Sequence, residues 1–162
     1  MRAFSLFFFS LFTILLSCSN SDDNGDNNPD PTPTTFVVPA TEDIVMYEIN
    51  PSPFSSTHDF QGIINRLDNI KALGINTIWI MPIFPVGEVN SFGSPYCIKN
   101  FTDVRSSLGT MDNFKLLVDK AHEKGMAVIL DWVANHTAWD NPWITSHRDW
   151  YLQDGAGSLL AQ

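Results

Sequence analysis

The sequence predicts an α/β fold of the barrel type, and three observations lead to this prediction. Strand-like and helix-like segments alternate, in the order strand, helix, strand, long loop, helix, strand. Residues 126–137, MAVILDWVANHT, begin as an apolar strand and then carry Asp131, Asn135 and His136. Both helix-to-strand joints are a single glycine, whereas the loop after the second strand covers residues 82–110. Barrel enzymes build their sites from such strand ends and long loops, so we expect the functional site there.

The first strand is predicted over residues 44–49, a β-favouring run that Asn50 and Pro51 close. The helix after it is predicted from apolar residues spaced three and four apart, with Gly74 where a helix ends. This single helical stripe consists of Phe60, Ile63, Ile64, Leu67, Ile70 and Leu73.

The second and third strands are predicted from apolar runs. Residues 75–81 are almost continuously apolar, as expected of a parallel strand that is covered on both faces. A second helix is predicted over residues 112–124 and ends at Gly125; its inward face consists of Phe114, Leu117, Val118 and Ala121. The third strand begins at Met126. Such repeated strand and helix units form parallel sheets with right-handed crossovers.

The segments around these strand ends resemble the α-amylase family of glycoside hydrolases. Residues 131–137, DWVANHT, resemble the signature of that family's third strand, with Trp132 where the family usually has valine. Residues 74–82, GINTIWIMP, resemble its second strand. The sequences SPY at 94–96 and LGT at 108–110 resemble the loop between the two strands. The resemblance implies a TIM (β/α)8 barrel.

A complete barrel needs about 250 residues, and the chain has 162. We therefore expect the N-terminal portion of a longer protein. Residues 36–134 would form the first three strands and two helices of the barrel, and residues 135–162 would begin the inserted B domain of the family.

The resemblance also implies roles for individual residues. Tyr96 would stack on the glucosyl unit on the non-reducing side of the scissile bond, and His136 would hydrogen-bond the same unit. Asp131 would be a structural acid at the strand end that orients a neighbouring arginine. Asn135 matches a calcium ligand of many members, and its amide oxygen suits that ion. From the residues alone, a packing role for Tyr96, a structural role for His136 and a loop-holding role for Asn135 stay open. No organic cofactor is expected.

The aromatic residues after His136 allow two interpretations. Residues 139–151 are dense in such side chains, namely Trp139, Trp143, Trp150 and Tyr151. They could form the core of the insert, which we favour, or a platform for sugar rings.

The family cleaves or transfers α-glucosidic bonds with retention, using a nucleophilic and an acid/base carboxylate about 5 Å apart. The resemblance places both beyond Gln162, so we expect an α-glucan hydrolase of which these 162 residues alone are inactive. None of the local acids is assigned a catalytic role, including Glu48, Glu88, Asp140, Asp149 and Asp154. The alternatives are an α-glucosidase or transglycosylase of the family, and a non-catalytic glycan-binding lipoprotein.

The N-terminus predicts export. Residues 1–17 contain Arg2 and then an uncharged apolar run that is too short to span a bilayer, as in a signal peptide. The sequence LLSC up to Cys18 resembles a bacterial lipobox, which implies an acylated Cys18 that anchors the protein in a membrane. Residues 18–35 are polar and are expected to form a disordered acidic tether. Their start, CSNSDD, resembles the signals that send Bacteroidetes-type lipoproteins to the outer membrane and cell surface; a simple solvated linker is the alternative.

The net charge limits the classes of expected partner, and the cysteine content limits the possible disulfides. The formal net charge is −9, which disfavours contact with a phosphate backbone, so no nucleic-acid partner is expected. With Cys18 acylated, Cys97 would be the one remaining cysteine and could not form an internal disulfide, so we assign it to packing. The expected partners are an α-glucan and the membrane.

Overall fold

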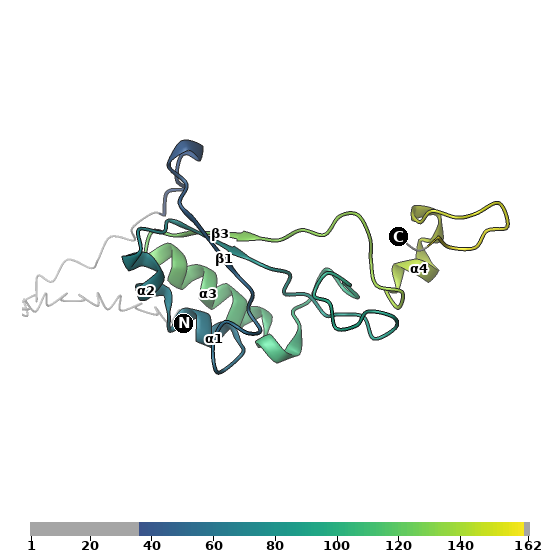
Figure 1. The fold of residues 1–162 in the computed structure, drawn as a ribbon, viewed down its shortest axis with the longest axis horizontal. Helices are drawn as coiled ribbons and strands as arrows, with labels where there is room; N and C mark the ends of the chain where they lie inside the picture. Colours follow the sequence, from purple (N-terminus) through teal and green to yellow (C-terminus); the bar gives the residue numbers. More distant parts are fainter. Residues whose placement is uncertain (1–35, 161–162) are drawn as a thin grey trace, which may run out of the picture. The chain divides into compact units, whose positions relative to one another are not determined.

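The structure, a computed structural model, describes residues 36–160. The predicted signal peptide and tether, including Cys18, lie outside this range. The described part contains a parallel sheet of β1 (Met46–Ile49), β2 (Thr77–Ile80) and β3 (Ala127–Leu130), in that spatial order (Figure 1). The parallel arrangement of three strands that are consecutive in the sequence confirms the predicted α/β fold.

The register of the sheet places the three strand ends at one edge. Ile49 pairs with Ile80, and Ile80 pairs with Leu130. The segments that follow the strands therefore leave the sheet side by side. The backbone N–H of Met81 donates to the carbonyl of Ile49, and that of Asp131 donates to the carbonyl of Ile80, which extends the pairing by one residue.

The predicted first helix is two short helices, α1 (Phe60–Ile64) and α2 (Leu67–Ala72). The helical ladder is interrupted because the N–H of Arg66 bonds to the carbonyl of Ile63, only three residues back. The apolar stripe stays on the buried face of both helices, since four of its residues are buried: Phe60, Ile63, Leu67 and Ile70. Leu73 was wrongly placed on the buried face. It is the C-cap residue of α2 and is 68% exposed, because the chain turns away through Gly74 at a φ of 84°.

The longest helix, α3 (Met111–Glu123), agrees with the predicted one to within a residue at each end. It begins with a capping box in which Thr110 and Asn113 satisfy each other's backbone N–H groups. Its chain then turns through Gly125, at a φ of 65°, into β3. The remaining elements are short: the 3-10 helices η1 (Thr41–Asp43), η2 (Ser106–Leu108) and η3 (Arg148–Trp150), and α4 (Trp143–Ser146).

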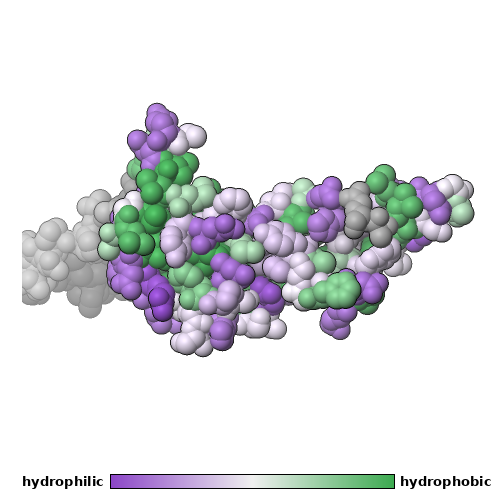
Figure 2. All heavy atoms as spheres, in the orientation of Figure 1, coloured by the Kyte–Doolittle hydropathy of each residue, from purple (hydrophilic) through white to green (hydrophobic). Residues whose placement is uncertain are grey.

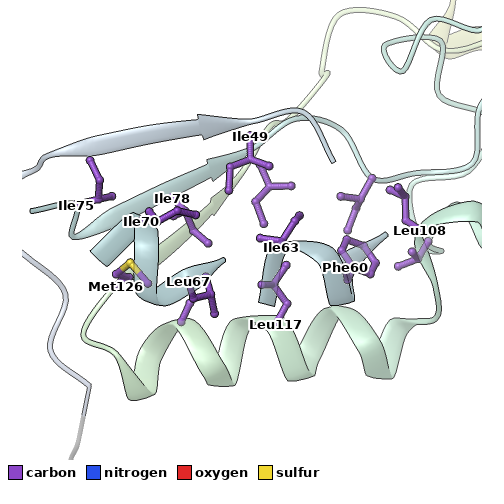
Figure 3. Close-up of a cluster of buried hydrophobic side chains, with 14 residues drawn as sticks. Ile49, Phe60, Ile63, Leu67, Ile70, Ile75, Ile78, Leu108, Leu117 and Met126 are labelled. Atoms are coloured by element: carbon purple, nitrogen blue, oxygen red, sulfur yellow. The ribbon is translucent and has the colours of Figure 1, made fainter. Parts of the chain in front are cut away.

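The hydrophobic core lies between one face of the sheet and the three helices α1, α2 and α3 (Figure 3). Ile49 and Ile78 point from the strands toward Phe60 and Ile63 of α1, and Leu117 of α3 closes the cluster from below (Figure 3). Each of these side chains is at most 1% exposed. Burial of apolar area of this kind is the main stabilising term of a small α/β unit.

The other face of the sheet has no covering layer among residues 36–160. Glu48, Trp79 and Ile129 form a row across the three strands, and Met46 and Ile129 are each 40% exposed. Hydrophobic surface is visible in Figure 2 over the region where Figure 1 shows β1. Val45, which directly precedes β1, is also exposed. Within the described range, no helix has both the length and the apolar character needed to cross a membrane.

Candidate functional site

The end of β3 and the loop between β2 and α3 bring two of the predicted site residues together. Asp131 directly follows β3, and Tyr96 lies 35 residues earlier in the loop. The phenol of Tyr96 donates a hydrogen bond of 3.2 Å to Oδ2 of Asp131. The sequence motifs named both residues but did not reveal that they touch. Whether Asp131 also orients an arginine stays a prediction.

The environment of Tyr96 keeps its phenol protonated. Burial raises the pKa of Tyr96, and the hydrogen bond to Asp131 and the negative charges of Asp131 and Glu48 raise it further. A neutral tyrosine that is fixed by its hydroxyl presents a ring of defined orientation. Such a ring can pack against the CH face of a sugar.

A short ribbon supports the loop that carries Tyr96. Val86 and Ile98 form an antiparallel bridge. On either side of this bridge, Gly87 N–H donates to the carbonyl of Cys97 at 2.9 Å, and Lys99 N–H donates to that of Pro85 at 2.8 Å. We call residues 85–87 and 97–99 the loop ribbon. Tyr96 directly precedes its second strand.

The segment after β3 is docked on the loop ribbon. Residues 131–142 contain no helix or strand, so their position depends on contacts with other segments. Ala138 N–H donates to the carbonyl of Ile98 at 2.9 Å, and the side-chain amide of Asn141 donates to the same carbonyl at 3.3 Å. Ala138 and Asn141 are both buried. The ribbon therefore holds the chain just after Asn135 and His136.

Asp140 forms a polar contact that sequence reasoning did not find. Its Oδ2 accepts the backbone N–H of Glu88 and lies 3.0 Å from Nζ of Lys99. The Glu88 N–H and the Lys99 ammonium lower the pKa of Asp140, and Asp140 and Glu88 together raise the pKa of Lys99. Asp140 is 41 residues from Lys99, so the contact leaves no local sequence pattern. Only correlated substitutions at the two positions in related sequences could have indicated it.

Asn135 and His136 lie elsewhere in the site, on a pocket of about 700 Å³. Both side chains are exposed, and Asn135 Nδ2 is 3.4 Å from His136 Nδ1. Trp132, which is 66% exposed, lines the same pocket. Tyr96 and Asp131 are joined by the hydrogen bond described above, whereas Asn135 and His136 are neighbours on the wall of the pocket.

The aromatic residues after His136 are divided between packing and exposure. Trp143 stacks on Phe101 with ring centroids 5.4 Å apart and meets Trp150 edge-on at 5.6 Å. Trp150 also stacks on His147 at 4.0 Å, yet it is 62% exposed. Tyr151 hydrogen-bonds Thr137 through its hydroxyl. Both tryptophans line the pocket. Trp143 is half-buried and packs on other rings, as the sequence favoured, whereas Trp150 is mostly exposed.

The described residues alone do not make up a calcium site. Calcium takes 6 to 8 oxygen ligands. Asn135 offers one amide oxygen, and no group of three or more His, Cys, Asp or Glu side chains among residues 36–160 is placed to share an ion. Cys97 is a free, partly buried thiol at the pocket wall.

The arrangement is suited to binding a neutral polyol. The pocket wall combines aromatic faces of Trp132 and Trp150 with the amide and imidazole of Asn135 and His136. The ring of Tyr96 is held beside Asp131, outside the residues that line this pocket. Rings stack on the CH faces of sugars, and the polar groups bond to hydroxyls. Oδ2 of Asp131 and Oδ2 of Asp140 accept the hydrogen bonds described above.

Comparison with known proteins gives consistent matches. The family model for the alpha-amylase catalytic domain matches residues 17–156. A probable oligo-1,6-glucosidase 2 of Bacillus subtilis is 41% identical over 107 residues, which are 63% of this chain and 18% of that protein. Alpha-amylase 3 of Dictyoglomus thermophilum is 35% identical over 127 residues, which are 70% of this chain and 25% of that protein.

A solved structure shows the same partial correspondence. The crystal structure of an alpha-amylase from Lactobacillus plantarum matches with a TM-score of 0.71 and 39% identity, over 74% of this chain and 29% of that one. The chain thus spans less than a third of the proteins it matches. The described sheet and helices are the N-terminal portion of a TIM (β/α)8 barrel, as the sequence predicted.

Proposed function

This chain belongs to the α-amylase family of glycoside hydrolases, and from that premise we propose that it is the N-terminal part of an α-glucan hydrolase that acts with retention. In this proposal, residues 36–160 supply part of the sugar-binding wall. The two reacting carboxylates come from later strands of the longer protein. The 162-residue chain alone is inactive.

The observation that supports this proposal most strongly is the Tyr96 to Asp131 hydrogen bond at the carboxyl end of β3. It fixes an aromatic ring where barrel enzymes bind substrate. In our proposal the ring of Tyr96 stacks on one glucosyl unit. The imidazole of His136, which is exposed and therefore accessible, donates to a hydroxyl of the same unit.

The reaction would proceed in two displacements. Retaining enzymes place a nucleophilic carboxylate and an acid/base carboxylate about 5 Å apart on either side of the bond. Tyr96 and His136 would hold the sugar while its ring flattens toward an oxocarbenium-like transition state. A hydrogen bond from His136 that strengthens during this change would accelerate the reaction more than it tightens ground-state binding.

A second function within the family is supported by the relatives themselves. Several of them are named as glucosidases rather than amylases. In this second proposal the described residues are the N-terminal part of an α-glucosidase or a transglycosylase of the family. Product analysis with long and short substrates separates these from an amylase.

The test measures release of reducing sugar from an α-1,4-glucan by the 162-residue chain, by the longer protein and by its variants. We expect no activity from the chain alone. His136→Ala should lower the rate of the longer protein about 10- to 100-fold, which corresponds to one charge-assisted hydrogen bond. Tyr96→Ala should weaken both binding and turnover, because stacking positions the sugar before it reacts.

Matched controls change the same residue types away from the strand ends. His122→Ala alters a histidine that stacks on Phe36 beside α3, and Tyr47→Phe alters a core tyrosine that packs on Phe54. Both should retain nearly full activity. Activity in the 162-residue chain, or unchanged kinetics in His136→Ala, would show that the proposal is wrong.

Two further parts of the proposal concern anchoring and calcium. We propose that Cys18 is acylated and holds the protein at the outer membrane and cell surface; mass spectrometry of the mature N-terminus should find a lipid-modified Cys18. A mature N-terminus without lipid would contradict this.

We also propose that Asn135 is one calcium ligand and that later residues supply the others. Chelation should then lower the melting temperature of the longer protein, and Asn135→Ala should reduce that effect.

A further inference from the structure

We propose that Gly87, Lys99 and Asp140 form a clasp that positions Tyr96 and His136 relative to each other, and that Asp140 is a positioning residue for sugar binding. This inference rests on the proposed function for its kinetic consequences. Its structural content stands on the contacts alone. None of the three residues touches the proposed sugar site directly.

Tyr96 and His136 lie on different segments. Tyr96 belongs to the loop after β2, and His136 belongs to the segment after β3. No recorded hydrogen bond in the described range joins the two residues. Because both are proposed to act on one sugar unit, an error in the distance between the segments affects both at once.

The two segments meet at the clasp. Asp140, four residues after His136, receives Lys99 Nζ and the backbone N–H of Glu88, both at 3.0 Å. Lys99 lies three residues after Tyr96. Oδ2 of Asp140 accepts both donors, whereas Oδ1 is buried and has no partner among the described residues. Burying Oδ1 without a hydrogen bond raises the free energy of the folded state. The contacts of Oδ2 therefore determine where the carboxylate lies.

The close approach of the two segments at Gly87 supports the clasp independently. A Cβ atom added there would lie 2.3 Å from Cβ of Ala138 and 2.4 Å from Oδ1 of Asp140. Gly87 is not among the residues with positive φ, so its backbone would accept alanine. The glycine is therefore required by close approach of the two segments. Its replacement would separate them without changing any charge.

The structural test follows the environment of Tyr96 in the longer protein. The protein is labelled with 3-fluorotyrosine, and the Tyr96 signal in the ¹⁹F spectrum is assigned with Tyr96→Phe. Asp140→Ala and Gly87→Ala should both shift this signal, because the loop would no longer be held against Asp131. Glu88→Gln is the matched control: it removes an exposed carboxylate 3.4 Å from the same lysine but leaves the Glu88 N–H in place. It should leave the signal unchanged.

The kinetic test uses a double-mutant cycle between Asp140 and Tyr96, which do not touch. Asp140→Ala should lower kcat by about 5- to 100-fold and change KM less, as expected when bound groups are misplaced by an ångström or less. In a Tyr96→Ala background, the same change should cost less than about twofold, because the residue it positions is gone. A merely structural role predicts equal losses in both backgrounds.

The outcomes separate the two proposals. A longer protein without activity on any α-glucoside would end the proposed function, and the clasp would then be judged by the ¹⁹F shifts alone. An active protein in which the losses are additive would overturn the positioning role of Asp140. Unshifted Tyr96 signals in both Asp140→Ala and Gly87→Ala would overturn the clasp itself.

Discussion

At the scale of single residues, the site depends on side chains whose partners are far away in the sequence. Asp131 and Tyr96 are 35 residues apart, and Asp140 and Lys99 are 41 apart. The motifs identified Tyr96 and Asp131 individually, because each lies within a recognisable segment, but they did not predict the contact between the two. They could not predict the second pair, since neither Lys99 nor Asp140 belongs to the motifs and a lysine–aspartate contact leaves no local pattern.

The Asp140 carboxylate should make stability depend on pH in a defined direction. Its pKa is below the ordinary value of 3.8 in the folded state, because the Glu88 N–H and then Lys99 favour the charged form. Its contribution is therefore complete above the unfolded pKa and is lost as the pH falls through the lower folded value. Asp140→Asn should be less stable than wild type at pH 7, and the difference should shrink below about pH 4.

This prediction is checked by urea denaturation of the longer protein and its Asp140→Asn variant at several pH values. A difference in unfolding free energy that stays constant down to pH 2 would contradict it. Asparagine retains the shape and one acceptor oxygen, so the comparison isolates the charge.

At the scale of elements, the prediction and the structure differ where the backbone hydrogen bonds of a helix are interrupted. The apolar stripe over residues 60–73 was correctly recognised as helical, but the spacing of apolar residues does not encode whether the backbone ladder is continuous. The break between α1 and α2 depends on the hydrogen bond from Arg66 to Ile63. By contrast, α3 starts at a capping box, which is a local signal and places the boundary within one residue.

The capping box of α3 should contribute measurably to stability. Thr110 Oγ1 accepts the N–H of Asn113 at 3.2 Å, and Asn113 Oδ1 accepts the N–H of Thr110 at 2.9 Å. Thr110→Ala should lower the free energy of unfolding by about 1 kcal/mol, because one N–H at the helix start loses its acceptor. Thr110→Ser should retain most of the stability. Equal losses in both variants would mean that the methyl group, not the hydroxyl, matters.

At the scale of the whole molecule, the main feature is that one face of the sheet is uncovered in the described range. A barrel interior is normally filled by side chains from all eight strands, and here only three strands contribute. Met46 and Ile129 are exposed on this face, and the outer edges of β1 and β3 have no partner strand within residues 36–160. Open edges beside apolar surface favour association between chains.

The isolated 162-residue chain should therefore be molten or aggregation-prone. We expect it to bind a hydrophobic dye, to sediment as larger species and to melt without a sharp transition. The longer protein, in which five more strands complete the barrel, is the control and should melt cooperatively. A monomeric 162-residue chain with a sharp melt would contradict this expectation.

The sequence by itself determined the type and order of the elements and the identity of the motif residues. Apolar periodicity and terminating glycines are local properties, so the three strands and α3 could be read directly. The family resemblance of local segments identified Tyr96, Asp131, Asn135 and His136. Only the tertiary structure decided which of these residues touch. The Tyr96 to Asp131 bond, the docking on the loop ribbon and the clasp join segments that are separated along the chain, and pairing at a distance depends on packing rather than on any local pattern.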